Sequence, residues 1–233
     1  MRTAVVCLLT ALMAGITNAA PEPKHPQWTE GQNYIVLPTS STQTTRGARV
    51  QVIEAFSYTC VHCFRFEPHI QSWLRTEGKE IAFTRIHSQW SPMHQALARL
   101  YYTLRTLHRS DLDPFVFEEI HIKKNRLFSE TTEETLKLQL NFAVSHGISR
   151  ADFERVYQSE QVDKELKAAQ QQLTTYRVEG TPSLIIDGRY LADVGHASKD
   201  GASEEENMDR LLQLAGDLVA LEQAQSIKIE ASR

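Results

Sequence analysis

Residues 50–76 read VQVIEAFSYTCVHCFRFEPHIQSWLRT, and Cys60 and Cys63 lie where a strand-like run gives way to a helix-like one. Residues 50–58 are mostly apolar with several β-branched side chains, as in a buried central strand. The helical pattern continues from Phe64. The first turn of a helix carries unpaired N–H groups and a positive partial charge, and these lower the pKa of a thiol placed there. The stretch therefore predicts dithiol/disulfide chemistry.

Two cysteines at this spacing can also form half of a zinc site or a structural disulfide. Structural zinc needs two further ligands, but the only other cysteine is Cys7, and the nine histidines are scattered singly. A structural disulfide usually closes a long loop, because its stabilisation grows with loop length. We therefore favour redox function, with a reactive thiolate at Cys60 that the imidazole of His62 stabilises as a donor or a nearby positive charge.

The amino terminus predicts export. Arg2 precedes an apolar stretch at residues 4–16, and small residues follow it at Ala19 and Ala20. The stretch is shorter than the roughly 20 residues that span a bilayer. We expect a signal peptide at residues 1–20, cleaved near Ala19 or Ala20, and a mature protein in an oxidising compartment. A buried first helix is the alternative.

Composition excludes some partners. The 233 residues carry a formal net charge of −4 and are 41% hydrophobic. This mildly acidic balance lacks the basic patch that nucleic acid or an anionic membrane would require. A chain of this length can bury a full core without disulfide staples. Cys60 and Cys63 are therefore free for chemistry.

The pattern of the remaining chain predicts an α/β core that is interrupted by helices. Short strands are expected at 34–37 and 81–86, and a hairpin at 183–194 with its turn at Asp187-Gly188. An amphipathic helix at 204–224 closes the core. Five helices are expected between the halves, at 95–107, 114–122, 133–146, 150–158 and 162–176. The predicted organisation is an amino-terminal arm at 21–32, a core at 33–90 and 178–225, and a helical insertion at 91–177.

Two segments together resemble a known family. Residues 56–68, FSYTCVHCFRFEP, followed by Gly180-Thr181-Pro182-Ser183, are similar to the DsbA family of periplasmic thiol:disulfide oxidoreductases. The resemblance implies a thioredoxin-like fold with an inserted all-helical domain, located in the periplasm. It also implies that Cys60 is the nucleophilic, client-linked cysteine, Cys63 the buried resolving one, and Pro182 a cis-proline facing them. Val61 departs from the proline of many members, which leaves the redox potential open.

The Thr181-Pro182 peptide bond has a physical reason to be cis. A cis peptide is essentially available only before proline, and it would turn the backbone of Thr181 outward toward an extended client segment. Main-chain pairing of this kind tolerates many client sequences. An ordinary trans turn leading into a strand is the alternative.

Two acidic residues near the cysteines match acidic positions of the family. Glu54 lies in the apolar strand, where an ionised carboxylate is costly unless it is paired, and Glu67 lies about one turn beyond Cys63. With Arg85 as a possible partner, they could manage protons as Cys63 becomes a leaving group. The alternative is that both carboxylates lie on solvated edges. The remaining histidines considered are interpreted as surface or packing residues: His69, His87 and His196.

The resemblance and the residues together predict a monomeric oxidase that works without metal or a diffusible organic cofactor. Its clients would be unfolded or reduced secreted proteins, and a DsbB-type membrane protein would reoxidise it. A reductase or isomerase could use the same cysteines in the dithiol state, although isomerases usually carry a dimerisation module and none is visible. A non-catalytic metal- or client-binding protein with a redox-like fold is the third possibility.

Overall fold

The computed structural model describes residues 28–38, 49–79 and 81–231, and its sheet has five strands within these ranges. The predicted signal peptide and most of the predicted arm lie outside the described residues. The strand order is β1-β5-β4-β2-β3, with β2 and β3 parallel and the other pairs antiparallel. The strands are β1 (Ile35–Val36), β2 (Val50–Phe56), β3 (Ile81–His87), β4 (Ser183–Ile186) and β5 (Tyr190–Asp193).

The register of the sheet brings two predicted charges together. Glu54 of β2 lies directly opposite Arg85 of β3.

Between β4 and β5, Asp187 and Gly188 both have positive φ angles, of 49° and 63°. This pair of angles is what a two-residue turn needs to match the twist of the strands. The Asp-Gly hairpin is therefore confirmed.

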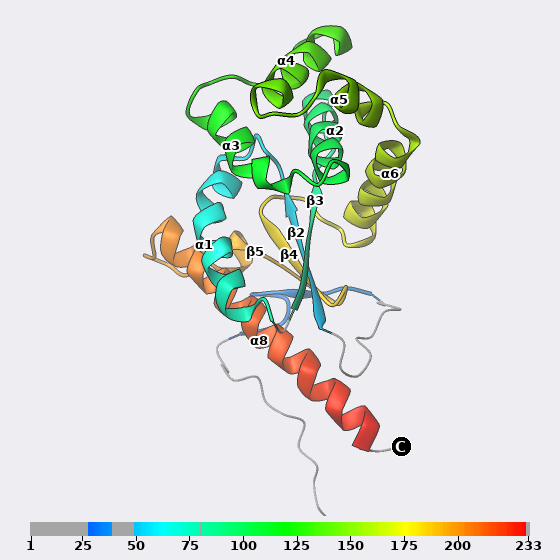
Figure 1. The fold of residues 1–233 in the computed structure, drawn as a ribbon. Helices are drawn as coiled ribbons and strands as arrows, with labels where there is room; N and C mark the ends of the chain where they lie inside the picture. Colours follow the sequence, from blue (N-terminus) through cyan, green and yellow to red (C-terminus); the bar gives the residue numbers. More distant parts are fainter. Residues whose placement is uncertain (1–27, 39–48, 80, 232–233) are drawn as a thin grey trace, which may run out of the picture.

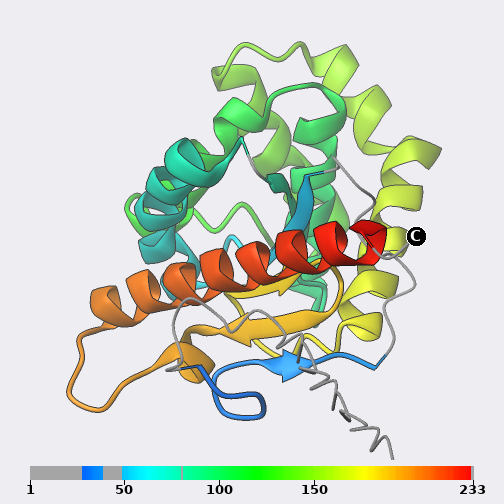
Figure 2. The ribbon, with the colours of Figure 1, turned by 90° about the horizontal axis from the view of Figure 1, so that it is seen from below.

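Two long helices cover one face of the sheet (Figures 1 and 2). They are α1 (Val61–Glu77) and α8 (Glu204–Ala231), and their buried side chains share a core with alternating residues of β2 and β4, such as Val52 and Leu184. Helix α1 begins earlier than predicted, because the sulfur of Cys60 accepts a hydrogen bond from the backbone N–H of Cys63 and caps the helix. The cysteine pair thus lies at the helix start itself.

The helices between β3 and β4 form a block at one end of the sheet (Figure 1). The long ones are α2 (Pro92–Thr106), α3 (Asp113–His121), α4 (Thr132–Ser145), α5 (Arg150–Tyr157) and α6 (Glu160–Thr175). Each lies within three residues of its predicted bounds. Helix α2 begins before Gln95, because Ser91 caps it and Pro92 fits the first helical position. Two short helical segments were not predicted: η1 (Ser110–Leu112) and α7 (Val194–Ala197).

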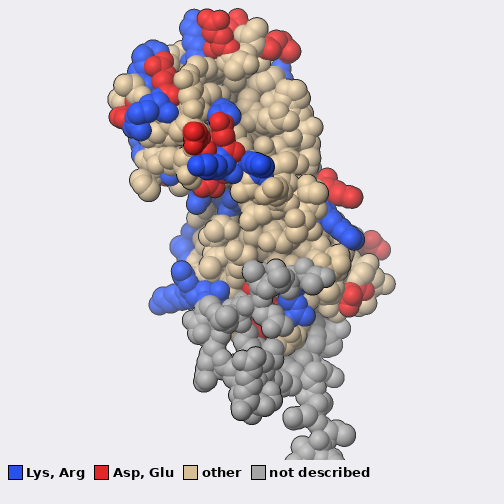
Figure 3. Space-filling model, turned by 90° about the vertical axis from the view of Figure 1, so that its right-hand side faces the viewer, with Lys and Arg blue, Asp and Glu red and all other residues tan. Residues whose placement is uncertain are grey.

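The block follows β3 and precedes β4 in the chain, so the predicted fold class, an α/β core with a helical insertion, is confirmed. Basic and acidic side chains are interspersed over the helical part of the face in Figure 3, and they do not gather there into a basic patch. Within the described ranges, no helix combines the length and the apolar character needed to cross a membrane.

Candidate active site at the amino end of helix α1

The two cysteines meet at the start of α1 as free thiols. The sulfur of Cys60 is half-buried and lies 3.3 Å from the backbone nitrogen of Cys63. Cys63 lies one turn further in, where only 1% of it is exposed. A reactant from solvent can therefore reach Cys60 but not Cys63.

The surroundings shift the pKa values of the two thiols in opposite directions. A hydrogen bond from the Cys63 thiol, aided by the Thr181 side chain and by the backbone N–H groups of His62 and Cys63, lowers the pKa of Cys60 from 9.0 to about 5, against the effect of burial. Burial raises the pKa of Cys63 well above its ordinary value, and hydrogen bonding to Cys60 adds to this. At neutral pH the reduced protein therefore has a thiolate at Cys60 and a thiol at Cys63.

The loop before β4 faces the cysteines. The peptide bond between Thr181 and Pro182 is cis, as expected. The thiol of Cys60 donates a hydrogen bond to the carbonyl oxygen of Thr181 at 3.2 Å. A hollow of about 580 Å³ adjoins this contact, and Thr181, Pro182 and His62 are among the residues that line it. Backbone and apolar surface are thus available next to the reactive sulfur.

The imidazole of His62 has a different partner from the one expected. Its Nδ1 lies 2.6 Å from Oε1 of Glu204 at the start of α8, and 58% of the side chain is exposed. Arg65 forms an ion pair with the same carboxylate. His62 helps to lower the pKa of Cys60 through its backbone N–H, which contributes less than the hydrogen bond from the Cys63 side chain. A carboxylate distant in sequence thus holds this ring, and the expected direct role of the imidazole beside the sulfur stays a prediction.

Glu54, Glu67 and Arg85 form one cluster behind the cysteines. The guanidinium of Arg85 lies 2.6 Å from Oε2 of Glu54 and 2.7 Å from Oε2 of Glu67. The side chains are 1%, 13% and 7% exposed for Glu54, Glu67 and Arg85. The alternative of two solvated carboxylates is therefore wrong. Burial raises the pKa of Glu54 to about 7, although Arg85 opposes the shift.

The helical block adds a third carboxylate that was not predicted. Asp113 of α3 lies 3.9 Å from Arg85 and accepts a short hydrogen bond from the hydroxyl of Tyr58. Burial raises the pKa of Asp113 to about 6. Nothing in the local pattern around Asp113 marks it, since its partners lie on β3 and before α1. Glu67, Arg85 and Asp113 line a hollow of about 710 Å³, which gives water a route to the carboxylates of Glu67 and Asp113.

The three histidines interpreted as surface or packing residues take such places. His87 is fully buried, accepts a hydrogen bond from the backbone N–H of Tyr58 at 3.0 Å, and has its pKa lowered to about 3 by burial. His69 and His196 lie 2.7 and 2.9 Å from the carboxylates of Asp209 and Asp193. A different histidine reaches the cysteine loop: Nε2 of His94 lies 3.1 Å from Oγ1 of Thr59.

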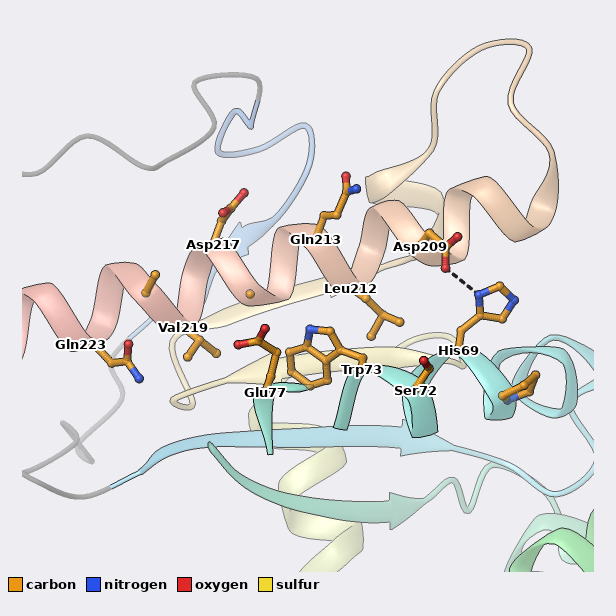
Figure 4. Close-up of a pocket in the computed structure, with 13 residues that line it drawn as sticks. His69, Ser72, Trp73, Glu77, Asp209, Leu212, Gln213, Asp217, Val219 and Gln223 are labelled. Carbon is orange, nitrogen blue, oxygen red and sulfur yellow. Dashed lines mark hydrogen bonds and ion pairs between the residues drawn. The ribbon is translucent and has the colours of Figure 1, made fainter. Parts of the chain in front are cut away.

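A further hollow of about 920 Å³ lies between α1 and α8. Figure 4 shows Trp73 and Glu77 of α1 pointing toward Leu212 and Val219 of α8. The residues that line it include neither cysteine and neither Thr181 nor Pro182. This hollow is therefore separate from the site. In the part of the chain that the structure describes, no three His, Cys, Asp or Glu side chains are arranged to hold a metal ion.

Several known proteins are similar to this chain in sequence or in fold. A family model described as thioredoxin matches residues 38–213. A thiol:disulfide interchange protein DsbA of Bordetella parapertussis is 31% identical over 205 residues, which cover 88% of this chain and 93% of the relative. One from Pseudomonas aeruginosa is 27% identical over 222 residues, covering 95% and 98%. The crystal structure of Pseudomonas aeruginosa DsbA has the same fold, with a TM-score of 0.74 and 24% identity, covering 85% of this chain and 96% of that one.

Proposed function

The chain belongs to the DsbA family of thiol:disulfide oxidoreductases, and on that premise we propose that Cys60 and Cys63 donate a disulfide to reduced client proteins. The observation that carries the assignment of roles is the difference between the two thiols. Cys60 is accessible and has a lowered pKa, whereas Cys63 is buried and has a raised pKa. A disulfide between such a pair is easily opened at Cys60, because the reduced state keeps a stabilised thiolate.

The first step begins with the oxidised enzyme. A client thiolate attacks the sulfur of Cys60, a client–Cys60 disulfide forms, and the Cys60–Cys63 bond breaks with its electron pair on Cys63. The raised pKa of Cys63 means that this buried sulfur takes up a proton. The hydrogen bonds that stabilise a negative sulfur at Cys60 prepare it for the second step.

In the second step, another client thiolate attacks the client sulfur of the mixed disulfide. The client disulfide forms and Cys60 leaves as a thiolate. A lowered pKa makes it a good leaving group. The client has then lost two electrons, and the enzyme holds a thiolate at Cys60 and a thiol at Cys63.

Glu54 is the proposed proton donor for Cys63. Its raised pKa of about 7 keeps part of the population protonated near neutral pH, and its charge raises the pKa of Cys63. A carboxyl that titrates near the working pH is suited to proton transfer. Around Glu54, the cation of Arg85 pairs with the carboxylates of Glu67 and Asp113. The hollow that these three residues line supports exchange of the proton with water.

Clients are proposed to bind along Thr181 and Pro182. The adjoining hollow offers backbone and apolar surface to an extended segment beside Cys60. Main-chain recognition suits an enzyme that acts on many secreted proteins.

We propose further that the monomer works in the periplasm after removal of residues 1–20, and that a DsbB-type membrane protein reoxidises it. Amino-terminal sequencing of native material should find Ala20 or Pro21 first; an intact Met1 would contradict export.

Trapping of intermediates tests the roles of the cysteines. In Cys63→Ser the mixed disulfide at Cys60 cannot be resolved internally, so client adducts should accumulate on non-reducing gels. Cys60→Ser should accumulate few, because Cys63 is buried. Equal trapping by both variants would overturn the assignment. Equilibration of the wild type with a glutathione buffer separates oxidase from reductase, since a strongly reducing potential would favour the reductase.

A further inference from the structure

Several histidines lie near the cysteine motif, and the structure holds two of them, His62 and His94, differently. The imidazole of His62 is bound by Glu204 at 2.6 Å. His94 is the third residue of α2 in the helical block, and its Nε2 lies 3.1 Å from Oγ1 of Thr59. Thr59 immediately precedes Cys60. The helical insertion therefore supplies a histidine to the loop that carries the reactive sulfur.

That loop is a small hydrogen-bonded unit. Oγ of Ser57 lies 2.9 Å from Oγ1 of Thr59 and accepts the backbone N–H of Thr59 at 3.3 Å. The carbonyl oxygen of Ser57 accepts the backbone N–H of Cys60 at 3.1 Å. A side chain that holds the Thr59 hydroxyl therefore also helps to fix the position of the Cys60 backbone, through these hydrogen bonds to Ser57.

Only one ring nitrogen of His94, Nε2, has a hydrogen-bond partner among the described residues. Its Nδ1 is shielded from solvent and has no hydrogen-bond partner among the described residues. The ring packs edge-on against Trp90, with 5.9 Å between centroids. The titratable groups that act on it are Cys60 at the start of α1 and His87 at the end of β3. Burial lowers the pKa of His94, and a negative charge at Cys60 raises it.

We propose that His94 is a positioning residue for Cys60, which holds the cysteine loop through Thr59 and takes up a proton beside the thiolate when the disulfide is reduced in mildly acidic solution. The inference rests on the proposed role of Cys60. During reduction the client dithiol gives up two electrons and two protons as its own disulfide forms. Cys63 keeps one proton and Cys60 remains a thiolate. The second proton is held on the His94 imidazole or leaves to water.

Thermodynamic linkage makes the effect reciprocal. If the thiolate favours the protonated imidazole, then the protonated imidazole favours the thiolate by the same factor. The reduced state therefore gains most in acid, where His94 is protonated. Near pH 8 the ring is neutral and this contribution disappears. A pH-dependent share of the oxidising power thus comes from the helical insertion.

The decisive variant is His94→Gln, whose amide can still reach Thr59 but cannot be protonated. Thiolate absorbance is titrated in the reduced protein, and the equilibrium constant with glutathione is measured at pH 5 and pH 8. For a coupling of about half to one pKa unit at a thiol with a pKa of about 5, the thiolate population at pH 5 falls about two- to fivefold, and the equilibrium constant falls by a factor of about 1.5 to 2. At pH 8 both stay at the wild-type level. His69→Gln, at an imidazole paired with Asp209 outside the site, is the matched control and should follow the wild type.

Variants of Thr59 test the hydrogen-bonded link. Thr59→Val removes the hydroxyl that meets Nε2 and should lower the equilibrium constant at both pH values, whereas Thr59→Ser should restore it. The inference would be overturned if His94→Gln gave the wild-type values at both pH values or lost equally at pH 5 and pH 8. It would also be overturned if His62→Gln, and not His94→Gln, showed the loss at pH 5 alone. A wild type that lacks a low-pKa thiolate at Cys60 would instead refute the proposed function.

Discussion

Reduction of the disulfide should make the stability of this protein depend on pH in a way that the oxidised form does not share. The lowered pKa of Cys60, about 5 against an ordinary 9.0, is available only to the reduced, folded state. Because a depressed pKa favours the folded state, the stabilisation is complete above pH 9 and is lost as the pH falls through about 5.

The full shift of about four units corresponds to a ceiling of about 5.5 kcal/mol, at about 1.4 kcal/mol per unit. At pH 7 only the part between pH 5 and 7 is expressed, which is a ceiling of about 2.7 kcal/mol. Cys60 is half-buried, and solvent screening reduces the effect of its partners. We therefore expect the stability of the reduced form, relative to the oxidised form, to rise by roughly 1 to 2 kcal/mol between pH 5 and 7.

Denaturant unfolding of both forms between pH 5 and 8 measures this difference. Glu54 and Asp113 titrate in both forms, so the subtraction removes most of their contribution. Reduced Cys60→Ser has no thiolate and should lose the rise, which makes it the matched control. A difference that stays flat over this range would refute the lowered pKa of Cys60. A more stable oxidised form at pH 7 would favour the reductase.

Three further predictions concern stability. Arg85→Met should lower the free energy of unfolding by about 3 to 5 kcal/mol at pH 7, because it leaves the carboxylates of Glu54 and Asp113 buried without their cation. The loss should shrink near pH 5, where carboxyls with raised pKa values are protonated; urea unfolding at the two pH values checks this, and an equal loss at both would contradict it. Gly188→Ala should cost about 1 to 2 kcal/mol, because the residue has a positive φ of 63°. Gly216→Ala, within α8, should stabilise by about 0.5 to 1 kcal/mol, since the added Cβ would meet Trp73 only at 3.9 Å; thermal unfolding of both variants should show shifts of opposite sign.

The features that could be predicted from the sequence are those with local signals. The strand before Cys60, the helix after it and the Asp-Gly hairpin each depend on a few neighbouring residues. The pairing of Glu54 with Arg85 was within reach, because two parallel strands joined by one helix place these residues opposite each other. The start of α1 was harder, since the cap is the cysteine itself and not one of the usual capping residues.

The contacts that could not be predicted join residues far apart in the sequence. Asp113 reaches Tyr58 across 55 positions, and Glu204 holds His62 across 142. The spacing within the motif placed His62 beside the sulfur, but spacing alone cannot say which of two nearby partners an imidazole chooses. Here a partly exposed carboxylate binds that ring, and Thr59 is contacted by a histidine from the helical block. The insertion therefore supplies Asp113 to the cluster around Arg85 and His94 to the loop that carries Cys60, and these two residues are the route by which we propose that it acts on the chemistry of the cysteines.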